Sequence, residues 1–237
     1  MGNEALHRTT FMIDVQGSGS LPNPDKLAMR RTLWSVVREA LAFAKIESGH
    51  RLEDRGDGVL GTLTADVPKV RLLGAGVEGL DRALRARNDG FVLRMGIHAG
   101  EVYEDEWGIA GSDVELACRL ADAPIARRTL EVASAARLAV VVSDPVHDSV
   151  VRHGGPFLFP EQYARVDVQI KEIDRTAWLY LPGYSTPPVP PPRPSPPAPP
   201  DHPPTGRQIN FHGSGAYFER STVHSMHIGD AHHAGER

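Results

Sequence analysis

The chain has 237 residues, of which 24% are charged, and a formal net charge of −4. This balance argues against a basic protein that coats nucleic acid, and no apolar run approaches the roughly 20 residues of a membrane span. The single cysteine, Cys118, cannot form an intrachain disulfide, and the N-terminus Met1–Arg8 resembles no export signal. We therefore expect a cytoplasmic protein that binds neither nucleic acid nor membrane.

Proline content divides the chain into three parts. Twelve of the 20 prolines lie between Pro187 and Pro204, where the backbone has few hydrogen-bond donors and favours extended polyproline II. We expect a folded domain over residues 1–183, a proline-rich linker over 184–206 and a Gly- and His-rich tail over 207–237. The linker is a spacer or a ligand for an aromatic groove of a partner protein. The tail either binds a transition metal through its histidines or forms short strands that dock on a partner chain.

Hydrophobic periodicity predicts alternating strands and helices before the linker. The first half is expected to contain a strand at 9–15, a helix that begins at Asn23 or Pro24, a hairpin of strands 51–54 and 59–63, and a helix over 68–88. The second half is expected to contain a hairpin of strands 91–98 and 101–104 around Ala99-Gly100, a helix from Ser112 or Asp113 to Leu120, a helix over 127–138, and strands at 140–142, 164–170 and 176–181. This order predicts an α+β, ferredoxin-like split βαββαβ fold, with a helix layer on one face of a largely antiparallel sheet.

Two carboxylates fall where this topology places them at one edge of the sheet. Asp14 lies where the first strand runs into Gly17-Ser18-Gly19-Ser20, and Asp57 lies at the tip of the next hairpin. Such carboxylates can share one or two hard divalent cations, Mg²⁺ or Mn²⁺, while the glycine-rich loop presents backbone amides to a triphosphate. Taken singly, an Asp-Gly pair is more often a plain turn and GSGS is more often a flexible loop.

Four motifs in order resemble the catalytic domains of class III nucleotidyl cyclases, the adenylate and guanylate cyclases. Phe11-Met12-Ile13-Asp14-Val15-Gln16-Gly17 is similar to their first metal motif, and Arg55-Gly56-Asp57-Gly58 is similar to the second, with the two aspartates 43 residues apart. The segment LRMGIHAGEV from Leu93 to Val102 resembles their R-[IM]-G-[IL]-H-x-G-x-V hairpin. The segment GSDVELACRL from Gly111 to Leu120 resembles their G-x-x-V-N-x-A-x-R-[ML] helix. The resemblance covers residues 9–183.

The resemblance implies that a nucleoside triphosphate is cyclised with the help of two metal ions in a head-to-tail homodimer. It assigns two Mg²⁺ or Mn²⁺ ions to Asp14 and Asp57, with the backbone carbonyl of Val15 as a further ligand. It assigns the phosphates to the loop Gly17-Ser18-Gly19. Lys171 either meets the terminal phosphate or is a solvated strand lysine.

The last motif differs from the family at one position. The resemblance assigns to Arg119, supplied by the partner protomer, the stabilisation of the transition-state phosphate, a role that suits a planar guanidinium. Glu115 stands where the family has an asparagine that orients the ribose. An ionised carboxylate cannot donate a hydrogen bond and it repels a triphosphate. Glu115 therefore weakens turnover, pairs with Arg119 one turn away, or fits a changed substrate pose.

Two positions that select the nucleobase in the family are unusual here. Glu53 replaces the lysine of adenylate cyclases and matches the glutamate of guanylate cyclases, whereas Gly108 offers no side chain for the second contact. In these unusual positions the chain resembles bacterial pyrimidine cyclases, which make cyclic CMP or cyclic UMP in antiphage defence. We therefore expect a cyclase with that product. The alternatives are a purine cyclase, an inactive nucleotide-binding module and an adaptor that dimerises and recruits a partner through its linker and tail.

Overall fold

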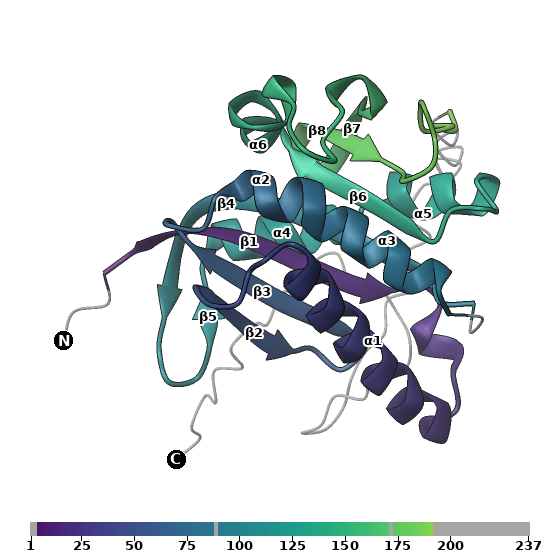
Figure 1. Ribbon diagram of the computed structural model, residues 1–237, viewed down its shortest axis with the longest axis horizontal. Coiled ribbons are helices and arrows are strands. Elements are labelled where there is room, and N and C mark those ends of the chain that lie inside the picture. Colours follow the sequence, from purple (N-terminus) through teal and green to yellow (C-terminus); the bar gives the residue numbers. More distant parts are fainter. Residues whose placement is uncertain (1–3, 88–89, 171–172, 192–237) are drawn as a thin grey trace, which may run out of the picture. The chain divides into compact units, whose positions relative to one another are not determined.

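The computed structural model describes residues 4–87, 90–170 and 173–191 (Figure 1). The described elements are β1 (Leu6–Val15), η1 (Ser18–Ser20), α1 (Asn23–Phe43), β2 (His50–Asp54), β3 (Gly58–Thr64), α2 (Lys69–Arg71), η2 (Leu72–Gly76), α3 (Val77–Arg85), β4 (Leu93–Glu104), β5 (Ile109–Ala110), α4 (Ser112–Ala121), α5 (Pro124–Val132), β6 (Leu138–Ser143), α6 (Asp144–Ser149), η3 (Val151–His153), η4 (Pro160–Gln162), β7 (Ala164–Ile170) and β8 (Ile173–Tyr180). None of the helices within these ranges is both long and apolar enough to cross a bilayer. The predicted tail and most of the predicted linker lie outside the described residues and stay predictions.

A mixed sheet with the strand order β2-β3-β1-β4-β6-β8-β7 forms the centre of the domain, and β5 pairs with β4. Neighbouring strands are antiparallel except for β4 and β6, which run parallel. A parallel pair needs a crossover connection, and here α4 and α5 lie between β4 and β6 in the chain. The predicted α+β fold with a largely antiparallel sheet is therefore confirmed.

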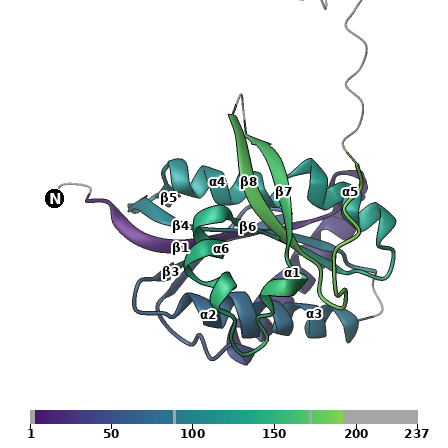
Figure 2. The same ribbon diagram turned by 90° about the horizontal axis from the view of Figure 1, so that it is seen from above.

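Helices cover both faces of the sheet, whereas the sequence predicted them on one face only. Helices α1, α2 and α3 lie on one side and α4 and α5 lie on the other (Figure 2). Strand β6 explains the second layer, because Val140 and Val142 pack into the core under α1 and α3 while Ala139 and Val141 pack into the core under α5. A strand buried on both faces is apolar throughout rather than alternating.

The hairpin predicted at Ala99-Gly100 is wrong. Strand β4 continues through both residues, which pair with Thr9 and Arg8 of β1. The chain turns after Glu104 instead, where Asp105 Oδ1 accepts hydrogen bonds of 2.8 Å from the backbone N–H groups of residues 107 and 108. Gly100 lets α4 lie close to β4, because a Cβ there would collide with the carboxylate of Asp113 on α4.

Two of the predicted helices also differ from the structure. The helix predicted over 68–88 contains a π-helical turn, η2, between α2 and α3. Gly74 in this turn lies so close to the backbone of Pro156 that a Cβ would collide with it. The helix predicted over 127–138 begins earlier, with Pro124 in its first turn, and ends at Val132. Proline is favoured at that position because its missing N–H is not needed there.

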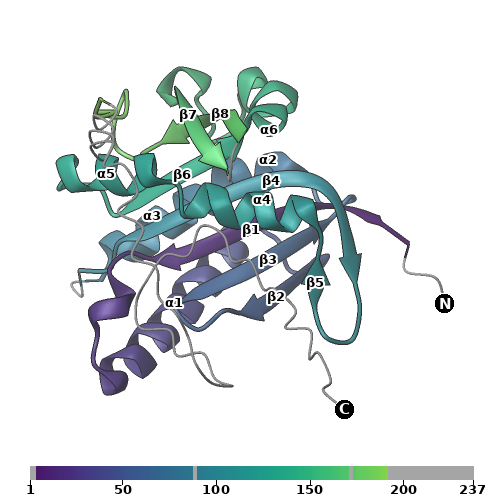
Figure 3. The same ribbon diagram turned by 180° about the vertical axis from the view of Figure 1, so that it is seen from behind.

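Gly96 determines how closely α4 lies on β4, and α4 crosses β4 and β1 in Figure 3. A Cβ at Gly96 would collide with backbone atoms of Ala117 and Ala121, which cannot rotate away as a side chain can. We expect Gly96→Ala to lower the free energy of unfolding by about 2–3 kcal/mol in urea denaturation, as overpacking does. Gly19→Ala is the control, because its Cβ would meet nothing within 4 Å. Equal stability of Gly96→Ala and the wild type would contradict this close packing.

Candidate active site

Strand pairing brings the end of β1 beside the turn that carries Asp57. Asp14 lies opposite Gly58 in the β1–β3 ladder. The backbone N–H of Val15 donates a 3.1 Å hydrogen bond to the carbonyl of Asp57. Ser18 closes the arrangement, since its hydroxyl donates to Asp57 Oδ2 at 2.5 Å. Asp14, Val15, Ser18 and Asp57 thus belong to one hydrogen-bonded junction of strand end, loop and turn.

The glycine-rich loop borders a hollow of about 530 Å³ next to Asp57. Gly17, at a φ of 81°, begins the single turn η1, a left-handed conformation that favours glycine. Three basic side chains to which the sequence analysis assigned no role share the hollow with the loop and the aspartate. The lining includes Ser18, Gly19, Lys26, Arg30, Arg55 and Asp57. A hollow with a glycine-containing backbone turn and several cationic side chains suits an anionic group such as a triphosphate.

Asp14 does not line this hollow, because its carboxylate is engaged elsewhere. It forms an ion pair with Arg94, a buried residue on the neighbouring strand β4. Arg94 also pairs with Asp122 at 2.9 Å, and Asp122 pairs with Arg127 at 2.8 Å. Burial raises the pKa of Asp14 above its ordinary value; Arg94 lowers it in part, and the charge of Asp57 raises it again. Asp57 directly precedes Gly58, the residue opposite Asp14, so the two aspartates are neighbours across the β1–β3 ladder.

The donor set fits a hard divalent cation that keeps water among its ligands. Carboxylates and backbone carbonyls are the oxygen donors that Mg²⁺ and Mn²⁺ prefer. Among the described residues, no group of three or more His, Cys, Asp or Glu side chains could hold an ion on its own. Asp14, Asp57 and the carbonyl of Val15 are oxygen donors of this kind and could hold such an ion with water among its other ligands.

Glu115 and Arg119 lie one turn apart on α4 and form a long ion pair. Their closest charged atoms are 3.9 Å apart, and their side chains are 62% and 38% exposed. No hydrogen bond or ion pair among the described residues joins Arg119 to Asp14 or Asp57. The predicted transition-state arginine is therefore not part of the junction within one chain. Lys171, the other predicted phosphate ligand, lies outside the described residues.

The first turn of α4 is fixed by a polar network in which His98 and Ser143 are buried and Asp113 is partly exposed. Asp113 accepts a 2.7 Å hydrogen bond from the backbone N–H of Glu101 and lies 3.3 Å from His98 Nε2. His98 Nδ1 shares a 2.8 Å hydrogen bond with the hydroxyl of Ser143. Burial lowers the pKa of His98, although Asp113 partly opposes this. His98 thus has a structural role, joining β4, β6 and α4.

Glu53 and Gly108, the two predicted base-selecting residues, are neighbours. A Cβ at Gly108 would lie 3.2 Å from Glu53 Oε1. The Glu53 carboxylate forms ion pairs with Arg51 at 3.1 Å and Arg55 at 2.9 Å. The contact with Arg51 lacks hydrogen-bond geometry, so among the described residues Oε1 has no hydrogen-bond donor. Arg51 also donates to the backbone carbonyl of Asp105, which ties β2 to the β4–β5 turn.

Sequence reasoning missed Arg94 and Asp122, although Arg94 lies inside a quoted motif. The signal was an arginine between two apolar residues, Leu93 and Met95, of a buried strand, because a buried charge requires a partner. Its partner Asp14 is 80 residues away in the chain, and a single sequence does not identify such a pair.

Arg94 supplies the counter-charge that Asp14 needs in the folded chain. Arg94→Met removes that charge and leaves a carboxylate in a partly buried position, so we expect the free energy of unfolding to fall by about 3 kcal/mol. Arg152→Met is the control, because the Arg152–Asp148 pair is exposed and such pairs contribute less than about 1 kcal/mol. Urea denaturation of both variants measures the difference. A loss no larger than that of the control would show that Arg94 does not stabilise the fold.

No protein-family model matches the sequence, and no protein of curated function matches it. Solved structures do match the fold. The adenylate/guanylate cyclase/hydrolase from Silicibacter pomeroyi has a TM-score of 0.55 at 21% identity, over 76% of this chain and 99% of that one. The guanylyl cyclase Cya2 has 0.54 at 18%, over 76% and 93%. The dimeric guanylyl cyclase domain of the RhoGC fusion protein from the aquatic fungus Blastocladiella emersonii has 0.51 at 16%, over 75% and 97%. The chain therefore has the fold of class III adenylate and guanylate cyclase catalytic domains.

Proposed function

We propose that the protein is a metal-dependent nucleotidyl cyclase that converts a nucleoside triphosphate into a 3′,5′-cyclic nucleotide and pyrophosphate. The junction of β1 with the Asp57 turn carries the proposal, because a shared fold by itself does not establish a function. The junction combines two aspartates that are neighbours across the β1–β3 ladder, a serine on Asp57 and a cationic hollow beside a glycine-rich loop. These features suit a triphosphate and the cations that accompany it.

Each part of the junction has a task in the proposed reaction. Asp14, Asp57 and the carbonyl of Val15 would hold Mg²⁺ or Mn²⁺, two ions per site, which when bound lower the pKa of the ribose 3′-hydroxyl and neutralise the phosphates. The amides of the loop Gly17-Ser18-Gly19, together with Lys171, bind and orient the triphosphate. The 3′-oxygen attacks the α-phosphorus, the bond from that phosphorus to the bridging oxygen breaks, and pyrophosphate leaves while the hydroxyl proton passes to solvent.

A second copy of the chain completes the proposed site. Arg119 has no hydrogen bond or ion pair with Asp14 or Asp57 among the described residues, so we assign it to the site of the partner protomer in a head-to-tail homodimer. There its guanidinium stabilises the charge that develops on the α-phosphate. The proline-rich linker and the tail, which follow this domain in the sequence, would recruit a protein partner.

For the base we propose a pyrimidine, with cyclic CMP or cyclic UMP as a signal in antiphage defence. Glu53 presents an acceptor between two guanidinium donors, Arg51 and Arg55. Uracil has the matching edge, with the N3–H donor between the O2 and O4 acceptors, and cytosine matches in part through its N4 donor and N3 acceptor. Guanine also combines donors with an acceptor, and two of the similar structures are guanylyl cyclases, so GTP is the alternative. Because Gly108 has no side chain, selection of the base would depend on Glu53 and its two arginines.

A second candidate is a cyclase-like module that binds nucleotide without turnover. One observation favours it. Glu115 replaces the neutral asparagine of the family and lies within ion-pair distance of Arg119, so it both repels phosphate and draws the arginine away.

Incubation of the purified protein with ATP, GTP, CTP or UTP and Mn²⁺, followed by mass spectrometry of the products, tests the proposal. We expect a cyclic pyrimidine nucleotide from CTP or UTP, and at least an about 100-fold lower rate for Asp57→Asn, because a metal ligand is lost. Cyclic GMP as the product would replace the pyrimidine assignment and keep the cyclase. No product from the wild type, with product from Glu115→Asn, would establish the second candidate.

Mixing two inactive variants tests the shared site. Asp57→Asn lacks the metal carboxylate and Arg119→Ala lacks the guanidinium, but a heterodimer of the two retains one site with both groups. Random exchange of protomers makes half of the dimers heterodimers, so the mixture should recover about a quarter of the wild-type activity. The rate is measured at equal total protein after subunit exchange. Failure to recover activity, with heterodimers shown by differential labelling, would place Arg119 outside the partner's site.

A further inference from the structure

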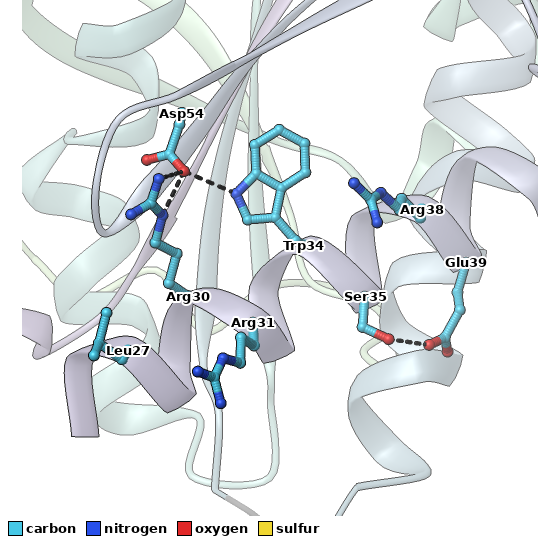
Figure 4. A pocket seen from close by; sticks show the side chains of 8 residues that line it. All are labelled: Leu27, Arg30, Arg31, Trp34, Ser35, Arg38, Glu39 and Asp54. Carbon is cyan, nitrogen blue, oxygen red and sulfur yellow. Dashed lines mark hydrogen bonds and ion pairs between the residues drawn. The ribbon is translucent and has the colours of Figure 1, made fainter. Parts of the chain in front are cut away.

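Asp54 joins the Asp57 turn to helix α1 through both of its carboxylate oxygens. Oδ1 accepts a 2.7 Å hydrogen bond from the backbone N–H of Gly56, the residue directly before Asp57. Oδ2 accepts from Arg30 Nε at 2.5 Å and from Trp34 Nε1 at 3.1 Å. Figure 4 shows Arg30 and Trp34 reaching from α1 toward this carboxylate. Asp54 therefore has donors on two separate elements.

Hydrogen bonds rather than packing hold the turn between β2 and β3. Asp57 is tied to the end of β1 by Val15 and to the loop by Ser18, but neither bond reaches helix α1. Arg55 N donates to Gly58 O at 2.9 Å at the base of the turn. Gly56 has a φ of 81° and a Cβ there would meet nothing within 4 Å. The tip therefore has no packing on that side, and its conformation depends on hydrogen bonds. The bond from Gly56 to Asp54 lies one residue from the carboxylate that has to be placed.

We infer that Asp54 is a positioning residue, which fixes the Asp57 carboxylate relative to α1 and to the loop before it. The inference rests on the proposed function, because it treats Asp57 as a cation ligand. Helix α1 begins three residues after η1, so the bonds from Arg30 and Trp34 link the helix that follows the phosphate loop to the turn that carries Asp57. Arg30 also lines the hollow beside Asp57, so its bond to Asp54 keeps one cation at the edge of that hollow.

Four variants separate positioning from general stability. Asp54→Ala removes all three hydrogen bonds, Asp54→Asn keeps one oxygen acceptor but loses the charge, and Trp34→Phe removes a single donor and keeps an aromatic ring. Asp148→Asn is the matched control on α6, because the Arg152–Asp148 bond is also 2.5 Å long and no residue of α6 lines the hollow. None of these changes touches the proposed metal ligands.

The test measures Mn²⁺ affinity of the full-length protein by calorimetry without nucleotide, and hydrogen exchange of the backbone amides of residues 55–58. Loss of a residue that orients a metal ligand typically weakens metal binding by about tenfold or more. We expect an about tenfold weaker Mn²⁺ affinity and faster exchange for Asp54→Ala, smaller effects for Asp54→Asn and Trp34→Phe, and wild-type values for Asp148→Asn. If Asp54→Ala fails to fold in thermal melting, the two milder variants carry the test.

Asp57→Asn in the same titration distinguishes the two ways to fail. If Asp57→Asn abolishes Mn²⁺ binding and the Asp54 and Trp34 variants bind like the wild type, the role of Asp54 is overturned and the proposed cation site stands. If Asp57→Asn binds Mn²⁺ like the wild type, the proposed cation site itself fails and the role of Asp54 fails with it. Weaker binding by the Asp148→Asn control, equal to that of Asp54→Ala, would also overturn the inference, because the effect would then be one of general stability.

Discussion

The register of β1 against β3 is the constraint on which the site depends. Ile13 and Val15 are buried in the core under α1 and α3, and alternation along a strand sends Asp14 to the opposite face. A slip of one residue would place Asp14 in the apolar core and expose its neighbours. The same register sets Asp14 opposite Gly58, so the packing of two apolar side chains determines where the Asp57 turn meets the strand end. Stability and chemistry here rest on the same ladder.

Arg94 shows how the fold stabilises a partly buried carboxylate that we propose as a cation ligand. A partly buried carboxylate without a counter-charge is costly, and Arg94 supplies that charge in the chain alone. Arg94 itself has a second carboxylate, Asp122. A cation that took over Asp14 would therefore leave the guanidinium paired rather than stranded. Ion pairs link Asp14, Arg94, Asp122 and Arg127 in a series of alternating negative and positive charges. Loss of the pair at Asp14 would therefore leave the other two pairs in place.

The sequence was informative where structure depends on local chemistry and less so where it depends on distant contacts. The strand β7 was predicted to the residue, and both aspartates lie at the turn and strand end expected of them. Ala99-Gly100 reads as a turn by local rules, but Gly100 is explained by the carboxylate of Asp113 on another element. The Asp105 turn, by contrast, had a local signal in its aspartate followed by Gly108.

Asp54 and Arg94 were missed because each acts through a partner that is distant in the sequence. Their partners, Arg30 and Asp14, are 24 and 80 residues away, and nothing in a single sequence marks such pairs. The motif around Asp57 drew attention to the carboxylate itself. Asp54, which holds that turn, lies only three positions earlier, but its partners Arg30 and Trp34 are on helix α1.

The five residues of strand β2 have distinct contacts on the two faces of the sheet. Leu52 packs against the core under α1, and Asp54, two positions on, reaches Arg30 and Trp34 on the same side. The intervening Glu53 points to the other face, where it meets Arg55 and the space left by Gly108. Because side chains alternate with a period of two, the residue that fixes Asp57 and the residue proposed to read the base cannot exchange places. β2 is also an edge strand, and a row of charged side chains on such an edge discourages pairing with other chains. The charges that shape the proposed site therefore also protect the sheet.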